Sequence, residues 1–125
     1  MPPRSTANAV LDARLTQGLV PRLRIFRDVS PASVGPLIKQ CWVMSGPRGT
    51  IIVERGARLP GVFGLAYGSA KLSLRGQDGE ERVLHLVSAG QTFGEAESLL
   101  GRPGHSEAIA LADSKLVVIP AAAIF

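Results

Sequence analysis

Between Trp42 and Pro120, turn-forming residues divide the chain into short apolar runs. The runs recur at intervals of about 8–12 residues, a spacing typical of an antiparallel sandwich or barrel. Because several runs are β-branched or alternate between polar and apolar residues, they are predicted to form strands. The strands expected on this basis cover residues 50–54, 61–67, 71–75, 82–87, 91–93, 107–112 and 115–119.

Proline, serine and glycine mark where other elements begin or turn. Asp78-Gly79, between two strand-like runs, predicts a tight hairpin turn. Ser30 followed by Pro31 predicts the N-cap and first residue of a helix, which Pro36 should keep short or kinked. A helix of about one and a half turns is expected over 95–100, and a last helix is expected to begin at Pro120.

The first 27 residues are predicted to form an N-terminal helical segment, and residues 28–125 to form the β-barrel domain. Apolar residues recur at helical spacing in the first part, and Pro21 should interrupt that helix. The residues that give this spacing are Val10, Leu11, Leu15, Leu19 and Leu23.

Composition excludes several classes of protein. The chain has 125 residues, enough for one compact domain, and 46% of them are hydrophobic, too many for a disordered chain. A single cysteine, Cys41, excludes an internal disulfide, a cysteine-based zinc site and an iron–sulfur cluster within one chain; its apolar neighbours predict a buried thiol. Neither a secretory signal nor an apolar stretch of about 20 residues is found, which predicts a cytoplasmic protein that does not contact a membrane.

Positive charge alone does not make this a nucleic-acid-binding domain. The formal net charge is +4, and much of the excess lies in the first 27 residues. Recognition of DNA also requires an element that reads it, and none is found in the sequence.

Residues 90–100 contain the most informative pattern. A strand is expected to end at Gly94 and a short helix to begin at Glu95. The first backbone N–H groups of a helix are unpaired and favour an anion, and glycine lets a ligand approach the backbone closely. Gly94 is therefore a candidate phosphate contact, and the Glu95 carboxylate is a candidate acceptor for sugar hydroxyls.

Catalytic motifs are absent from the sequence. No G-x-S-x-G elbow occurs, and neither histidine lies in a recognisable catalytic arrangement. The chain is therefore predicted not to be an enzyme. An alternative is a cupin-like barrel metalloenzyme that uses His85 and His105.

The triplet Phe93-Gly94-Glu95, followed by Leu99-Leu100, resembles the phosphate-binding cassette of the cyclic nucleotide-binding domain family. The order of the other segments resembles the same family, and the bacterial CRP/FNR transcription regulators in particular. The similarity extends from about Phe26 to Phe125, through segments 46–56, 68–72, 78–84 and 108–120. The resemblance implies a mainly β jelly-roll barrel with short flanking N-terminal helices and the start of a C-terminal helix.

The resemblance also implies an effector site. Family members hold the phosphate and ribose of cAMP or cGMP with the cassette Gly and Glu, here Gly94 and Glu95, and with an Arg-Ser/Thr-Ala trio. That trio falls on His105, Ser106 and Glu107, so a histidine stands where the family has arginine. Arg102 is the candidate substitute. A haem or another small organic effector is a further alternative, and a third reading is a ligand-free dimerisation module.

The regulators of this family continue into a dimerisation helix and a DNA-binding domain. The sequence ends at Phe125, where that helix would begin. We therefore expect an effector-sensing domain of a regulator that forms a homodimer, with Ile124 and Phe125 along the subunit contact. DNA is expected to bind only through a domain that is not present in this chain.

Overall fold

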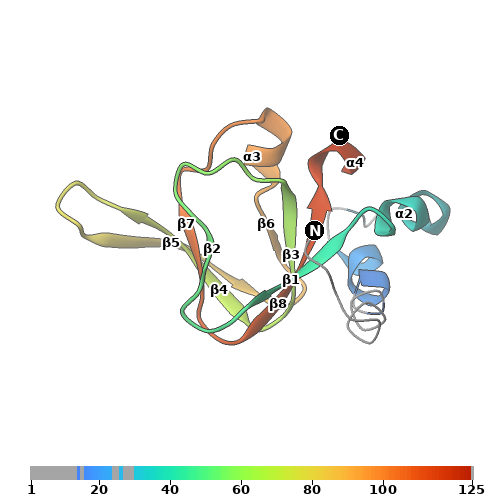
Figure 1. Ribbon diagram of the computed structural model, residues 1–125, viewed down its shortest axis with the longest axis horizontal. Helices are drawn as coiled ribbons and strands as arrows, with labels where there is room; N and C mark the ends of the chain where they lie inside the picture. Colours follow the sequence, from blue (N-terminus) through green and yellow to red (C-terminus); the bar gives the residue numbers. More distant parts are fainter. Residues whose placement is uncertain (1–13, 15, 24–25, 27–29, 125) are drawn as a thin grey trace.

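The computed structural model describes residues 14, 16–23, 26 and 30–124, and they form a sandwich of two antiparallel four-stranded sheets. The strand order is β1-β8-β3-β6 in the first sheet and β2-β7-β4-β5 in the second (Figure 1). The expected mainly β jelly-roll architecture is confirmed. The strands of the first sheet are β1 (Trp42–Gly46), β8 (Ser114–Pro120), β3 (Gly61–Tyr67) and β6 (Thr92–Phe93). Those of the second are β2 (Ile51–Val53), β7 (Glu107–Ala110), β4 (Ser69–Arg75) and β5 (Glu81–Ser88).

The two central strands of the first sheet are covered on both faces. On β8, Leu116 and Val118 point into the sandwich, whereas Val117 and Ile119 belong to a second cluster on the outer face of the sheet. All four side chains are fully buried. Burial on both faces explains why β3 and β8 are continuous apolar runs rather than alternating ones.

Short helices supply the outer cover. The 3₁₀ helix η1 (Val20–Arg22) and the helix α2 (Pro31–Ile38) contribute Val20, Val34 and Leu37 to the cluster on the outer face. Ser30 caps α2 by accepting a hydrogen bond from the Ser33 backbone N–H at 3.3 Å, as predicted. The helix contains Pro36 and is only eight residues long.

Cys41 follows α2 and is half-buried rather than fully buried as expected. Its Sγ donates to the Leu37 carbonyl oxygen at 3.4 Å. Burial raises the pKa of the Cys41 thiol from 9.0 to about 11, because desolvation disfavours the thiolate. The thiol is therefore protonated near neutral pH and a poor nucleophile.

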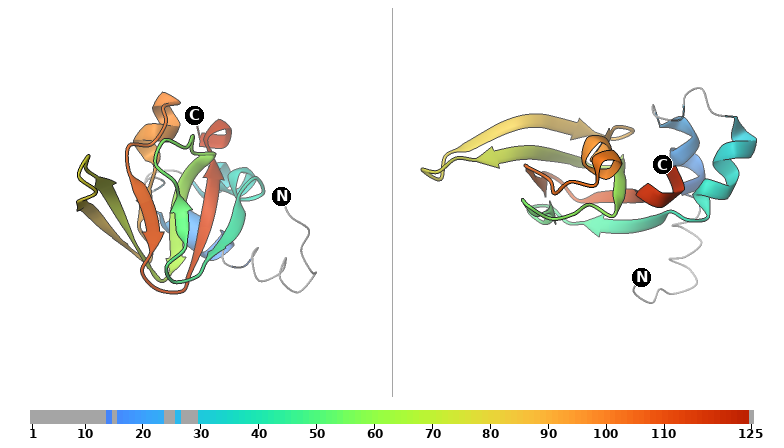
Figure 2. Two further views of the ribbon diagram at one scale, coloured as in Figure 1. Left: turned by 60° about the vertical axis from the view of Figure 1, so that its left-hand side comes forward. Right: turned by 90° about the horizontal axis from the view of Figure 1, so that it is seen from above.

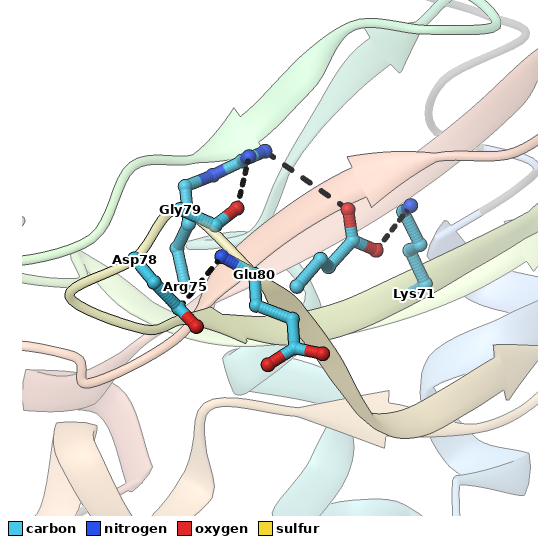
Figure 3. Close-up of polar contacts among 6 residues, drawn as sticks. Lys71, Arg75, Asp78, Gly79 and Glu80 are labelled. Carbon is cyan, nitrogen blue, oxygen red and sulfur yellow. Dashed lines mark hydrogen bonds and ion pairs between the residues drawn. The ribbon is translucent and has the colours of Figure 1, made fainter.

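The β4–β5 hairpin projects away from the rest of the molecule, opposite to α2 (Figure 2). Lys71 Nζ and Glu81 Oε1 are 2.5 Å apart across it, and Arg75 Nη2 lies 3.9 Å from Glu81 Oε2 (Figure 3). The hydrogen bond from Lys71, assisted by both positive charges, holds the pKa of Glu81 below its ordinary value. At the tip, Asp78 Oδ1 accepts from the Glu80 backbone N–H at 3.1 Å. The hairpin turn is present, but the Gly79 N–H donates to the Gly76 carbonyl oxygen at 3.0 Å, so Gln77 and Asp78 rather than Asp78 and Gly79 are at its centre.

Two sequence predictions need correction. Strand β1 was not expected, although it pairs along its whole length with β8. Pro120 ends β8, where it pairs with Gly61, and the helix α4 (Ala121–Ile124) begins one residue later. Pairing with β3 extends the strand through the proline and delays the helix.

The boundary between residues 27 and 28 remains a prediction. Val10, Leu11 and Leu15 lie outside the described residues. Val20, Leu23 and Phe26, on the N-terminal side of the boundary, share one hydrophobic cluster with Val34 and with strands of the first sheet. The described N-terminal residues therefore pack against the barrel.

Candidate functional site

The cassette segment, residues 93–106, begins at the end of β6 and runs through the six-residue helix α3 (Glu95–Leu100). Gly94 is the N-cap of α3 with φ of 88°, a left-handed conformation that favours glycine. Its carbonyl oxygen accepts from the Ser98 backbone N–H at 3.0 Å. The helix predicted over 95–100 is thus present with the expected bounds.

A small cavity lies beside α3, and the carboxylate that lines it is that of Glu97 rather than that of Glu95. Thr92 Oγ1 donates a hydrogen bond to Glu95 Oε1, which directs that carboxylate back toward β6. Glu95 is half-buried and does not line the hollow, whereas Glu97 does. The assignment of a ligand contact to Glu95 remains a prediction, and Glu97 is a candidate that the sequence analysis missed.

The loop after α3 separates the other three candidates. Gly104 and Ser106 line the hollow. His105 is exposed and does not line it, and Arg102 is exposed in the same loop. The structure therefore brings Gly94 and Ser106 together on one cavity and leaves Glu95, Arg102 and His105 off its wall.

The cavity has a volume of only about 30 Å³, the space of roughly one water molecule. Pockets for small organic ligands usually measure about 300–1,000 Å³. No lysine or arginine lines it among the described residues. The lining residues are Val53, Leu59, Leu72, Phe93, Gly94, Glu97, Gly104, Ser106 and Ala108.

Leu59 closes this cavity. A methyl group added to Gly94 would lie 2.5 Å from Leu59 Cδ2, and one added to Gly104 would lie 3.4 Å from Leu59 Cδ1. The leucine side chain therefore packs against both glycines of the cassette segment. Neither Leu59 nor Gly104 was singled out from the sequence, because no motif marks them and only the fold brings them together.

Leu59 belongs to the 54–60 loop, which joins β2 to β3 and runs beside the loop that follows α3 (Figure 1). Gly56 N–H donates to the Gly104 carbonyl oxygen at 2.9 Å, and Gly104 N–H donates to that of Ala57 at 3.0 Å. Arg58 Nη1 donates to the Gly101 carbonyl oxygen at 2.5 Å.

The same loop reaches the C-terminal helix. The carbonyl oxygen of Pro60 accepts from the backbone N–H of Ala121, the first residue of α4, at 3.2 Å. The 54–60 loop is therefore bonded both to the cassette segment and to the start of α4.

The metalloenzyme alternative gains no support. His85 lies on β5 beside a separate hollow with Gly90, Gln91 and Thr92, whereas His105 is exposed in the loop before β7. Within residues 14, 16–23, 26 and 30–124, no three His, Cys, Asp or Glu side chains are grouped so that they could hold one metal ion.

Two antiparallel sheets, with a glycine-capped helix beside a small cavity, define a β-sandwich domain with a candidate ligand cassette. The cyclic nucleotide-binding domain model matches residues 43–125, and the chain belongs to this family. Its relationship to sensor domains of CRP/FNR-type regulators, expected from the sequence, is confirmed. A CRP-like cAMP-activated global transcriptional regulator of Mycobacterium tuberculosis is 26% identical over 99 residues, which are 79% of this chain and 44% of the relative. The chain thus spans less than half the length of the curated relative it matches.

Solved structures show the same fold. The sensor domain of the transcriptional regulator DNR from Pseudomonas aeruginosa has a TM-score of 0.80 at 21% identity, over 89% of this chain and 75% of that one. A putative cyclic nucleotide binding protein from Ruegeria pomeroyi has a TM-score of 0.82 at 22% identity, over 89% and 49%. The regulatory domain of Toxoplasma gondii PKA, crystallised with cAMP, has a TM-score of 0.80 at 16% identity, over 98% of this chain and 45% of that one.

Of the helices that the structure describes, none has both the length and the apolar character needed to cross a membrane.

Proposed function

We propose that this chain is the non-catalytic effector-sensing domain of a CRP/FNR-like transcription regulator in the cytoplasm. The observation that carries the proposal is the position of Leu59, whose methyl groups rest on Gly94 and Gly104. A ligand that enters the cassette must displace this side chain. The effector is a small molecule, and DNA is contacted through a domain outside this sequence.

Leu59 is connected to the C-terminal helix α4 through the residue that follows it. Leu59 is followed by Pro60, whose carbonyl oxygen holds the first backbone N–H of α4. A ligand that binds only when Leu59 has moved therefore stabilises a different position of the 54–60 loop and of α4. We propose that this population shift is the signal passed to the DNA-binding part of the regulator.

α3 is suited to moving with the ligand. Leu99 and Leu100 on this helix are exposed, and Ser98 Oγ is buried without a hydrogen-bond partner among the described residues. Because a buried unpaired hydroxyl costs about 1–3 kcal/mol, a position of α3 that gave Ser98 Oγ a hydrogen-bond partner would recover part of that cost.

A cyclic nucleotide is the first effector to test. The relative from Mycobacterium tuberculosis is named as cAMP-activated, and the Toxoplasma gondii structure contains cAMP. In this chain the phosphate would meet no cation on the cavity wall among the described residues. Arg58 and Arg102 lie in the two loops that border the cavity and are the candidate charge partners.

Leu59→Ala should bind cAMP or cGMP at least about tenfold more tightly than the wild type, because the side chain that fills the cassette is shortened. This ratio corresponds to about 1.4 kcal/mol. Isothermal titration calorimetry of both proteins with each nucleotide measures it.

Leu111→Ala is the matched control, because Leu111 is exposed, does not line the cassette cavity and lies outside the 54–60 loop. It should bind as the wild type does. Equal affinity of all three proteins would show that Leu59 does not obstruct the site. Absence of heat with either nucleotide at millimolar concentration, in every variant, would exclude a cyclic nucleotide as the effector.

We also propose that the domain associates as a homodimer. Of the contact expected along Ile124 and Phe125, Ile124 is half-buried against the outer-face cluster and Phe125 lies outside the described residues, so we place the contact on exposed leucines of the β4–β5 hairpin and α3. Leu86 is 60% exposed and Leu99 is 61% exposed, although large apolar side chains usually avoid water. Leu84 on the same strand and Leu100 on the same helix are also exposed.

Leu86→Glu should convert the wild-type dimer to a monomer, because a carboxylate would be buried without a partner in the contact. Light scattering after size-exclusion chromatography measures the mass of each species. Ile51→Glu, at an exposed position on β2 at the opposite edge of the same sheet from β5, should remain dimeric. A monomeric wild type would contradict the homodimer.

A further inference from the structure

A second hollow, of about 360 Å³, lies on the side of the sandwich where β1 and β2 form the edges of the two sheets. Its volume is within the range of pockets for small organic molecules, unlike that of the cassette cavity. The hollow is lined mainly by apolar side chains from four strands: Trp42, Met44, Ile52, Val53, Phe63 and Val118.

This hollow is separate from the effector cassette. Gly94, Glu97, Gly104 and Ser106 line the cassette cavity and do not line the hollow. Leu59 and Val53 line both and form the wall between them. A molecule in the hollow would therefore contact the outer side of the leucine that closes the cassette.

The lining chemistry indicates what kind of molecule fits. Trp42 and Phe63 both line the hollow, but one face of the buried Phe63 ring is stacked on Phe93, so the half-buried Trp42 supplies most of the aromatic surface. An aromatic surface favours another ring over an aliphatic chain of equal area. Glu54 and Arg58 border the hollow with opposite charges and form no ion pair with each other. Because these charges offset one another, the rim gives no preference for a charged ligand.

We propose that the hollow at the β1–β2 edge binds an uncharged, ring-bearing organic molecule. The site differs from the cassette in its residues and in the class of its ligand. Occupancy supports Leu59 from the side opposite the cassette, so the two sites share one wall.

N-phenyl-1-naphthylamine is a suitable probe, because it is uncharged, ring-bearing and fluorescent in apolar surroundings. Trp42 is the only tryptophan in the chain and lines the hollow, so it serves as a built-in energy donor. We expect saturable binding of one dye per chain, with loss of Trp42 emission and matching gain of dye emission. Non-saturable binding, or binding without transfer from Trp42, would overturn the proposal.

Ala57→Phe should weaken dye binding at least about tenfold, because Ala57 lines the hollow but not the cassette and a larger side chain would fill it. Ala122→Phe, exposed on α4, is the matched control and should bind as the wild type does. Unchanged affinity in Ala57→Phe would place the dye elsewhere, for example on the exposed leucines, and overturn the proposal.

Trp42→Phe covers the case in which Ala57→Phe fails to fold. This variant keeps an aromatic face and should still bind the dye under direct excitation, but without energy transfer. Transfer that persists without Trp42 would overturn the proposal. This experiment measures dye fluorescence, whereas the test of the proposed function measures the heat of cyclic nucleotide binding. Failure of the domain to bind a cyclic nucleotide would therefore leave the dye result unaffected.

Discussion

Gly61→Ala should destabilise the domain by about 3 kcal/mol or more, at or above the upper end of the usual cost of overpacking. The added Cβ would lie 1.9 Å from the carbonyl oxygen of Ile119 and 2.9 Å from Pro120 Cα. Both are backbone atoms, so no side-chain rotation relieves the contact. β8 would have to move, yet it is paired with β1 on one side and β3 on the other.

Urea unfolding followed by circular dichroism measures this loss. Gly35→Ala is the control, because a Cβ at Gly35 meets nothing within 4 Å and lies inside α2. That substitution should leave stability unchanged or raise it by up to about 1 kcal/mol. The same unfolding midpoint for the two variants would show that β3 and β8 do not approach as closely as described.

Phe93→Ala should cost about 3–5 kcal/mol, as is usual when a buried phenylalanine is truncated. Phe93 is 4% exposed, and its ring stacks on Phe63 with centroids 5.0 Å apart and planes 5° from parallel. The substitution removes the stack between β6 and β3, and it also enlarges the cassette cavity that Phe93 lines.

Phe93→Leu is the conservative variant, and it should lose less stability because it leaves a smaller void. Urea midpoints of wild type, Phe93→Leu and Phe93→Ala should therefore fall in that order. A Phe93→Ala protein as stable as the wild type would mean that the Phe63–Phe93 stack does not stabilise the packing of the cassette segment against the sheet.

Turn chemistry made much of the fold predictable. Asp78-Gly79 allows a tight turn between β4 and β5, and Ser30 can satisfy backbone donors of α2, because both effects act within a few residues. The bounds of β3 and α3 also agree with expectation. The bounds of β1 and of the end of β8 did not agree, because they depend on pairing between segments about 60 residues or more apart, such as Gly61 on β3 with Pro120 on β8.

The candidate site was less predictable than the fold. An argument from family resemblance placed Gly94 and Ser106 in one effector site, and both residues line the same cavity. The same argument could not show that Glu95 is held by Thr92 or that His105 is exposed. Those outcomes depend on side-chain hydrogen bonds and on the path of the loop after α3.

The sequence by itself determined the antiparallel β class and its hairpin, because turn residues and strand runs act locally. The resemblance of residues 93–100, and of the segments around them in the same order, indicated the family. Only the tertiary structure decided the state of the site. Leu59 lies 35 residues before Gly94 and 45 before Gly104, yet its side chain rests on both. Whether a cassette is open or filled depends on such contacts between loops that are distant in the sequence, and no local pattern records them.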